Sequence, residues 1–419
     1  MKLPALVMVC LLLGGPTRLF AQMSEEKPPA EMIQELMVRI DQLERRIAQL
    51  EKGEARVTPV PGLGGTTIAA RDHEQMGTAM QTEAQATYPG LKLAGFGDFT
   101  FSGLDQRGTR SGFNAGQFTL HLNSMLSPKV SFLGEITLSA RADAGTGTPA
   151  ATGFNAEVER SIVRFDQNDR FKVSFGRYHT PINYWNTAFH HGQWLQTTVA
   201  RPEMTQFGGR FIPVHFVGAL VEGAAPARGL NLNYNFGVGN GRGSVISRGG
   251  EAGDNNNHRA WLVNIFARPD QLYGLQVGGS VYRDKVTLAA GRDYPEWISS
   301  AHVVWQKETP EVVAEFANIN HHDAQAPTSN WNSQAFYVQL AYRLPAFEKL
   351  WKPYYRFEYI HIPRSDAVLQ GVPNLAGSVL GLRYDISSFA ALKFEYRNQR
   401  RAPGQPRING GFIQTSFTF

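Results

Sequence analysis

Residues 392–397 read Leu392-Lys393-Phe394-Glu395-Tyr396-Arg397, so that apolar or aromatic residues alternate with charged ones. Successive side chains of a β-strand point to opposite faces, which gives this stretch one apolar face and one charged face. The same period of two recurs in residues 117–123, 171–175 and 336–343. Beyond Tyr88 the sequence therefore predicts short β-strands, each with one apolar and one polar side.

The alternation predicts sixteen strands, and the pattern alone leaves fourteen or eighteen open. We expect the strands at 90–104, 113–127, 130–141, 155–166, 169–178, 207–222, 229–240, 258–268, 271–283, 295–307, 310–320, 331–343, 352–362, 374–386, 389–399 and 409–419.

The links between these strands have a regular order. Links after even-numbered strands are mostly tight, as in Ser127-Pro128-Lys129, Gln167-Asn168, Pro269-Asp270, Glu308-Thr309 and Ser387-Ser388. Links after odd-numbered strands are longer and rich in Gly, Asn, His and Arg. An even number of strands with tight turns at one end is typical of a bacterial outer-membrane barrel. The predicted fold is all-β, a transmembrane antiparallel β-barrel; a secreted soluble β-protein is the alternative.

The last predicted strand supports this fold. Ile413, Thr415, Phe417 and Phe419 share one face, and the chain ends on Phe419. A final strand that closes on a terminal Phe resembles the signal by which the barrel-insertion machinery recognises outer-membrane barrels. The resemblance implies insertion into the outer membrane of a Gram-negative cell.

The first 22 residues have the pattern of a signal peptide. Lys2 supplies a positive start, residues 6–13 are apolar, and a plausible cleavage site follows Ala21. The only cysteine is Cys10. Cys10 is removed together with the predicted signal peptide, so the mature protein has no cysteine. This excludes a disulfide scaffold, a zinc–thiolate site and a cysteine nucleophile. A lipoprotein anchored at Cys10 is disfavoured because Val9 stands where a small residue is needed. No other stretch is continuously apolar, which excludes a helical membrane protein.

Residues 23–52 are predicted to form a periplasmic α-helical coiled coil. Ile33, Ile40 and Ile47 fall at heptad position a, and Leu36, Leu43 and Leu50 fall at position d. Ile at a with Leu at d generally favours dimers. Two Arg-h-x-x-h-Glu segments, with h apolar, resemble a trimer-specifying motif and favour a homotrimer. The predicted trimerisation residues are Arg39, Ile40, Leu43, Glu44, Arg46, Ile47, Leu50 and Glu51.

A single amphipathic helix that packs on the rest of the chain is the alternative to this coiled coil. Residues 53–89 have no period and contain several Gly and Pro residues, which predicts a flexible linker. The barrel domain then covers residues 90–419.

The longest predicted external loop, residues 179–206, follows the fifth strand. Its aromatic residues favour an inward fold, because aromatic side chains in a solvated outer loop would be costly. We expect this loop to constrict a channel. The predicted constriction residues are His179, Tyr184, Trp185, His190, His191, Trp194, Arg201 and Glu203.

Part of the sequence resembles a known family. Residues 171–181, Phe-Lys-Val-Ser-Phe-Gly-Arg-Tyr-His-Thr-Pro, are similar to the strand and Thr-Pro turn of the phosphate-selective porin O/P family, and Glu159-Arg160 lies on the preceding strand. The resemblance covers residues 155–215 and implies a porin. Trimeric sixteen-stranded general porins fold the corresponding third loop inward to narrow the channel. A coiled coil before the barrel is similar to the dicarboxylate-type porins. The clustered arginines and lysines of the phosphate-selective members are missing, since the loop itself offers only Arg201.

The charge balance indicates a preference for anions. The net formal charge of the chain is +5. Residues 1–89 have a net charge of −2, so residues 90–419 have a net charge of +7. A basic lumen concentrates anions. The basic residues predicted to line the pore are Lys92, Arg160, Arg164, Lys172, Arg356, Arg383, Lys393 and Arg397. Any one of them could equally pair with an acidic residue on a neighbouring strand.

Other functions have weaker support. His190-His191 and His321-His322-Asp323 suggest metal sites, but adjacent residues rarely point toward one ion. The sequence has no nucleophile motif, and residues 237–243 lack the helix that a phosphate-binding loop requires. We therefore expect neither an enzyme, nor a cofactor or metal, nor nucleic-acid binding.

The sequence thus predicts a trimeric outer-membrane porin for passive diffusion of small hydrophilic solutes, with a preference for anions such as phosphate or carboxylates. Outer-membrane lipid and lipopolysaccharide are the expected partners. The alternative is a structural anchor, in which the coiled coil reaches peptidoglycan and the barrel is plugged.

Overall fold

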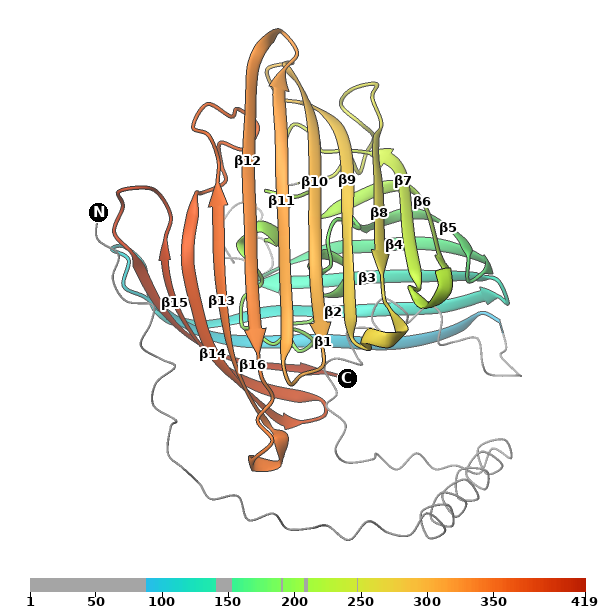
Figure 1. The fold of residues 1–419 in the computed structure, drawn as a ribbon. Helices are drawn as coiled ribbons and strands as arrows, with labels where there is room; N and C mark the ends of the chain where they lie inside the picture. The colour runs from blue at the N-terminus through green and yellow to red at the C-terminus, as the bar shows by residue number, and fades with distance from the viewer. Residues whose placement is uncertain (1–87, 141–152, 190, 207–209, 247) are drawn as a thin grey trace. The chain divides into compact units, whose positions relative to one another are not determined.

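The computed structural model of the chain describes residues 88–419 except 141–152, 190, 207–209 and 247. Sixteen antiparallel strands close into one barrel, in which each strand pairs with its sequence neighbours and β1 pairs with β16 (Figure 1). The predicted fold class is confirmed. The predicted signal peptide, the coiled coil and all of the linker except Tyr88 and Pro89 lie outside the described residues.

The strands are β1 Gly90–Leu104, β2 Gly112–Ser127, β3 Val130–Ala140, β4 Phe154–Asn168, β5 Phe171–His179, β6 His215–Ala225, β7 Leu232–Asn240, β8 Ala260–Ala267, β9 Leu275–Thr287, β10 Asp293–Gln306, β11 Glu311–Asp323, β12 Ala326–Ala341, β13 Trp351–His361, β14 Leu375–Ser387, β15 Ala390–Arg400 and β16 Ile408–Thr418. The short helices are α3 Trp185–Ala188, η2 Glu203–Thr205, η3 Ala227–Gly229, η4 Asp270–Leu272 and η5 Phe347–Lys349. Among the described residues, no helix has the length and apolar composition needed to cross a membrane.

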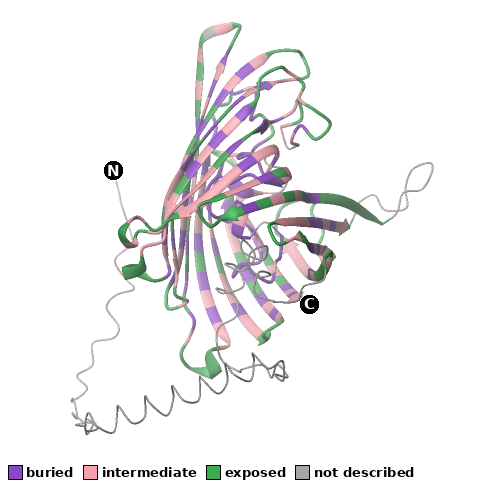
Figure 2. Cartoon of the chain, turned by 90° about the vertical axis from the view of Figure 1, so that its right-hand side faces the viewer, coloured by how far each residue is buried: buried purple, intermediate pink, exposed green. Residues whose placement is uncertain are grey.

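The alternation of side chains sorts each strand into an inner and an outer face, visible as alternating colours along the strands in Figure 2. In β15, Lys393 and Glu395 are buried inside, whereas Phe394 and Tyr396 are exposed outside. In β12 the inner residue Gln339 is buried and the outer Leu340 is exposed. The period of two in the sequence therefore reports inside and outside, as expected for a barrel.

The barrel closes between the first and last strands. The backbone N–H of Gly95 donates to the carbonyl of Phe419 at 2.9 Å, and the N–H of Phe419 donates to the carbonyl of Gly95 at 3.1 Å. A Cβ on Gly95 would come within 2.4 Å of the Phe419 ring, so a larger residue at this position would displace the ring. The Phe419 ring stacks on Phe118 and remains half exposed on the outer face.

Some predicted boundaries are wrong. Gln167 and Asn168 belong to β4, and the turn consists of residues 169–170. The link between β11 and β12 is only residues 324–325, although it follows an odd-numbered strand. These two strands instead continue as a hairpin beyond their neighbours (Figure 1). We call the barrel end with residues 169–170 the turn end, and the opposite end the loop end.

Candidate functional site

The segment after β5 folds into the barrel. His179, the last residue of β5, pairs with His215, the first residue of β6, so residues 180–214 leave the wall and return to it at one level. We call residues 180–214 the lumen loop. Its described large apolar side chains are buried: Ile182, Tyr184, Trp185, Phe189, Trp194, Leu195, Val199, Met204, Phe211, Ile212 and Val214. The loop is longer than the predicted 179–206, because residues 211–214 pack inside instead of starting β6.

Glutamates on the far wall bind the backbone of the lumen loop. Glu315 on β11 accepts hydrogen bonds from the N–H groups of Tyr184 and Trp185, at 2.8 and 2.6 Å. Glu395 on β15 accepts one from Val199 at 2.9 Å, and Glu358 on β13 accepts one from Glu203 at 2.7 Å.

Basic side chains on the same wall bind the loop's carbonyl groups. Arg383 on β14 donates to the carbonyls of Trp194 and Gln196, at 2.7 and 2.9 Å. Lys393 on β15 donates to the carbonyls of Gln196 and Thr198, at 2.8 and 3.1 Å. Arg356 on β13 donates to the carbonyl of Ala200 at 2.8 Å.

The loop therefore crosses the lumen from β5 and β6 to β11–β15. An irregular segment has backbone groups that need partners once buried, and the wall supplies them as charged side chains. Charge-assisted hydrogen bonds of this kind contribute about 1.5–3 kcal/mol each. The position of the loop is fixed by this set of contacts together with its apolar side chains.

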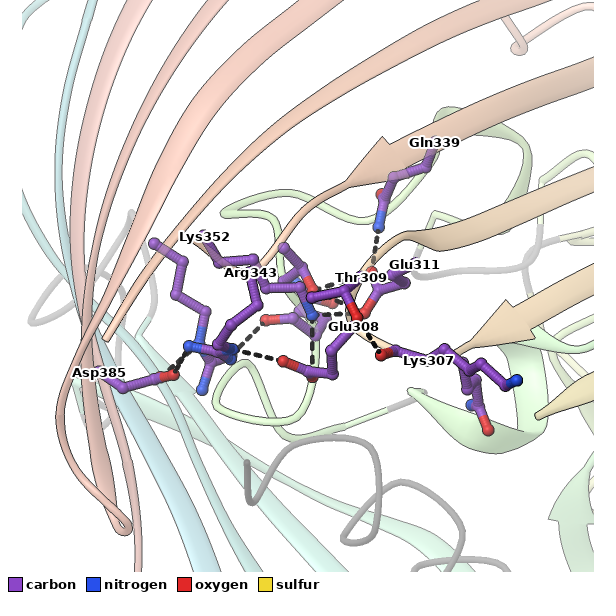
Figure 3. A network of polar contacts seen from close by, with 12 residues as sticks. Lys307, Glu308, Thr309, Glu311, Gln339, Arg343, Lys352 and Asp385 are labelled. Carbon is purple, nitrogen blue, oxygen red and sulfur yellow. Dashed lines mark hydrogen bonds and ion pairs between the residues drawn. The ribbon is translucent and has the colours of Figure 1, made fainter. Parts of the chain in front are cut away.

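A second network secures this wall at the turn end (Figure 3). The ammonium group of Lys352 lies 3.0 Å from Glu308 and 2.6 Å from Glu311. Glu311 also accepts a hydrogen bond from the hydroxyl of Thr197 in the lumen loop at 2.9 Å. Arg343 pairs with both Glu308 and Asp385. The network thus connects the lumen loop to the turn between β10 and β11.

The opposite wall leaves space. A cavity of about 530 Å³ lies between the lumen loop and strands β2–β9, toward the turn end. Its charged lining residues are Arg160, Arg164, Asp169, Lys172, Glu222 and Arg268. Aromatic side chains also line it: Phe132, Tyr178, Tyr234 and Phe266. By formal count the lining is net positive, with four basic and two acidic side chains. Two of the basic side chains are paired with carboxylates next to the cavity, Arg160 with Glu135 and Arg164 with Asp166.

At the loop end, a buried charged network joins the external loops to the lumen loop. Arg242, in the link between β7 and β8, lies 3.4 Å from Glu296 on β10 and donates to the carbonyl of Phe211. His321 on β11 lies between Glu296, at 2.8 Å, and Asp366, at 3.0 Å.

Asp366 belongs to the link between β13 and β14. Burial opposes its ionisation, but hydrogen bonds from His321, Ser333 and the Leu369 N–H outweigh burial and lower the pKa of Asp366. We call Arg242, Glu296, His321 and Asp366 the roof network.

The predicted constriction residues lie inside the barrel. His179, Tyr184, Trp185, His191, Trp194 and Arg201 are all less than a tenth exposed. Burial lowers the pKa of the Arg201 guanidinium to about 9, so it remains charged at neutral pH. Glu203 is partly exposed and pairs with Arg401 at 3.4 Å. His190 and the predicted trimerisation residues are outside the described part of the chain.

The predicted pore-lining residues fall into two groups. Arg160, Arg164 and Lys172 line the cavity. Arg356, Arg383 and Lys393 point inward but are at most 1% exposed, because the lumen loop covers them. Of the other two, Lys92 is exposed, and Arg397 pairs with Glu395 at 2.6 Å.

Sequence reasoning missed the roof network. His321 and His322 are adjacent, but His321 points inward whereas His322 is on the outer face, which separates the suspected pair. Asp366 lies in a link whose sequence gives no sign of a partner 45 residues away. The period of two could have placed Glu296 and His321 on the inner face, but it could not have shown that the two residues are in contact.

No protein-family model matches the sequence, and no curated protein sequence matches it. Solved structures do resemble it. An anion-selective porin from Comamonas acidovorans is 10% identical with a TM-score of 0.57, over 79% of this chain and 99% of that one. The outer membrane channel DcaP of Acinetobacter baumannii is 12% identical with a TM-score of 0.53, over 80% and 100%. Salmonella typhi OmpF, in complex with daunomycin, is 11% identical with a TM-score of 0.53, over 79% and 98%. At these identities the likeness concerns the barrel fold.

Proposed function

We propose that this protein is an outer-membrane channel for passive diffusion of small hydrophilic solutes, with a preference for anions. The observation that carries the proposal is the lumen loop, which is bound across the barrel by charged wall residues and leaves a polar cavity beside it. A segment that narrows a lumen without filling it selects solutes by size and charge. The porin folds of the similar structures support this proposal.

The outer surface of the barrel supports a membrane location. Large apolar and aromatic side chains are exposed on every part of the wall, among them Leu93, Phe99, Phe175, Val238, Ile265, Val303, Leu340, Tyr355, Leu380, Phe394 and Ile413. Such a surface would be costly in water, whereas lipid covers it without needing a protein partner. Closure of the sheet also pairs the backbone polar groups that lipid could not satisfy.

The charge of the cavity supports the anion preference. Its lining is net positive, and the barrel sequence carries a +7 excess. A positive lumen raises the local concentration of anions and lowers that of cations. The aromatic side chains of the lining offer apolar contacts, which suit anions with an apolar part, such as carboxylates.

Planar-bilayer conductance of the purified protein, with the reversal potential in a KCl gradient, tests this function. We expect discrete conductance steps and a reversal potential shifted toward the chloride equilibrium potential. Steps in groups of three would support the homotrimer predicted from residues 23–52. A reversal potential on the potassium side would contradict the anion preference.

The second candidate function is a structural anchor with a plugged barrel. It is favoured by the roof network, whose side chains are at most 2% exposed and tie two external loops to the lumen loop. In this case correctly folded barrels would give no conductance. Removal of residues 23–52 should weaken the trimer without blocking barrel folding, and in an anchor it should also release the barrel from peptidoglycan.

A further inference from the structure

Histidines and glutamates from five strands meet at the base of the lumen loop. Glu135 on β3 lies 3.1 Å from His121 on β2 and 3.6 Å from His179 on β5. Glu159 on β4 lies 2.7 Å from His215 on β6 and 3.3 Å from His191, which belongs to the lumen loop. These four imidazoles and two carboxylates are distant in the sequence and become neighbours only when the barrel closes around the loop.

Three of these residues have the geometry of a metal site. One ligand atom from each of Glu135, His179 and His191 lies within 4.8 Å of the other two, and the residues are 0%, 5% and 1% exposed. We propose that Glu135, His179 and His191 bind a divalent transition-metal ion such as Zn²⁺. Two imidazole nitrogens with one carboxylate oxygen form a ligand set typical of zinc and its neighbours. Calcium and magnesium prefer oxygen ligands throughout, so they do not suit this site.

Neighbouring side chains orient the proposed ligands. The Oε1 atom of Gln117 on β2 lies 3.2 Å from Nδ1 of His191, which holds the ring with Nε2 turned toward Glu159 and the cluster. His121 and Arg160 both contact the carboxylate of Glu135. Metal-binding histidines and carboxylates usually have such outer hydrogen-bonding partners, which fix the ligands before the ion arrives.

A guanidinium group lies beside each carboxylate of the cluster. Arg160 pairs with Glu135, and Arg177 lies 3.9 Å from Glu159. Arg201 also acts on Glu159. These cations favour the ionised carboxylate, which is the form that binds metal. Neutral imidazole is also the form that binds metal.

Metal binding would give the lumen loop an attachment on its near side. The contacts from β13–β15 hold the loop's middle, from Trp194 to Glu203, on the far wall. His191 lies just before that stretch, and the other two ligands belong to β3 and β5. The ion would therefore join the loop to the cavity wall. This proposal does not depend on conduction, so it can fail or succeed independently of the proposed function.

Zinc binding by the refolded, untagged chain without its predicted signal peptide tests the site. Protein refolded into detergent lacks lipopolysaccharide, which itself binds divalent cations. After equilibration with micromolar Zn²⁺ and removal of excess, we expect one zinc ion per chain by elemental analysis. His191→Gln and His179→Gln should each lower the affinity about 100-fold, since loss of an outer partner alone costs about 10–100-fold. The control His258→Gln changes an exposed histidine outside the cluster and should bind like the parent chain.

Cobalt gives a second measurement on the same samples. Co²⁺ in an imidazole–carboxylate site should produce visible absorption bands that His191→Gln abolishes and His258→Gln retains. If His179→Gln does not refold, His191→Gln decides the matter, because its side chain is in a loop and not in a strand. A parent chain that binds no zinc, or that binds zinc equally well in both ligand variants, would overturn the proposal.

Discussion

The two sides of the barrel wall use the same kinds of residue in different ways. On β11–β15 the inward-facing charged side chains, such as Lys393 and Glu315, are buried against the lumen loop and bind its backbone. On β2–β9 the inward-facing basic side chains, such as Lys172 and Arg164, line the cavity. An inward-facing charged residue in the barrel can therefore either bind the backbone of the lumen loop or line the cavity. The path of the loop decides which of the two it does.

This difference changes what the positive charge of the barrel means. Arg356 pairs with Glu358 at 2.8 Å, and Arg383 pairs with Asp385 at 2.7 Å. The lumen loop also covers these two side chains and Lys393, so the three basic groups contribute little to the potential that an ion in the cavity experiences. The anion preference should depend on the cavity wall instead. If the two sides are separable, substitutions on one side should change the attachment of the loop and substitutions on the other should change ion selectivity.

Removal of the loop tip should have the largest effect. Deletion of residues 184–195 removes α3 and the aromatic side chains buried in the lumen, so we expect a severalfold increase in single-channel conductance in planar bilayers. Deletion of residues 402–406, an exposed external link between β15 and β16, is the control and should leave conductance unchanged. Equal conductance of the parent and the 184–195 deletion would show that the loop does not constrict the pore.

Loss of a single loop contact should have the next largest effect. Lys393→Met removes the charged donor to the carbonyl of Thr198 and one of the two charged donors to that of Gln196, which weakens attachment of the loop by about 1–3 kcal/mol. We expect frequent conductance transitions in recordings from this variant, because the loop leaves the wall more often. Lys172→Met on the opposite wall is the matched control and should give steady recordings. Noise of the same kind in both variants would mean that the two sides are not distinct.

A charge change in the cavity lining should have a smaller effect. Lys172, the control position of the previous experiment, is the test position here. Lys172→Glu places a negative charge in the cavity lining, so the reversal potential in a KCl gradient should move toward the potassium side. The shift should shrink at high ionic strength, because salt screens charges in a wide aqueous space. Arg107→Glu, an exposed external position, should leave the reversal potential almost unchanged. A shift independent of salt would indicate that the substitution altered the loop.

Much of the fold could be predicted from the sequence, because the alternation of Phe394 and Tyr396 with Lys393 and Glu395 reports a local property of the backbone. The outer surface and the lumen of a closed barrel impose that alternation on every strand, so the sixteen predicted strands lie almost in place. The start of β6 was missed because Phe211, Ile212 and Val214 are apolar for another reason: they pack inside the lumen.

The site could be predicted only as a segment. The aromatic residues of the lumen loop indicated that it folds inward, but nothing in the local sequence says which wall it contacts. Glu315 lies 131 residues from Tyr184, and Lys393 lies 197 residues from Gln196. Contacts over such separations depend on barrel closure and on the direction of the loop, which a pattern of neighbouring residues does not contain.

The smallest effect we predict concerns pH and the roof network. The pKa of Asp366 is lowered in the folded protein, so this group stabilises the link of residues 362–374 above the usual aspartate pKa, and the stabilisation is lost as pH falls through the lowered value. The link should therefore stay closed at pH 5 and open only below about pH 4. Asp366 accepts hydrogen bonds from the Val368 and Leu369 amides, so their hydrogen exchange, corrected for its intrinsic pH dependence, reports on closure. Asp366→Asn should exchange faster at pH 5 and lose this acid transition, while amides of the lumen loop on the β11–β15 side keep their protection. If low pH increased the hydrogen exchange of the 362–374 link and of the lumen loop together, the roof network and the lumen loop would open as one unit. The difference between the two walls would then not extend to the loop end.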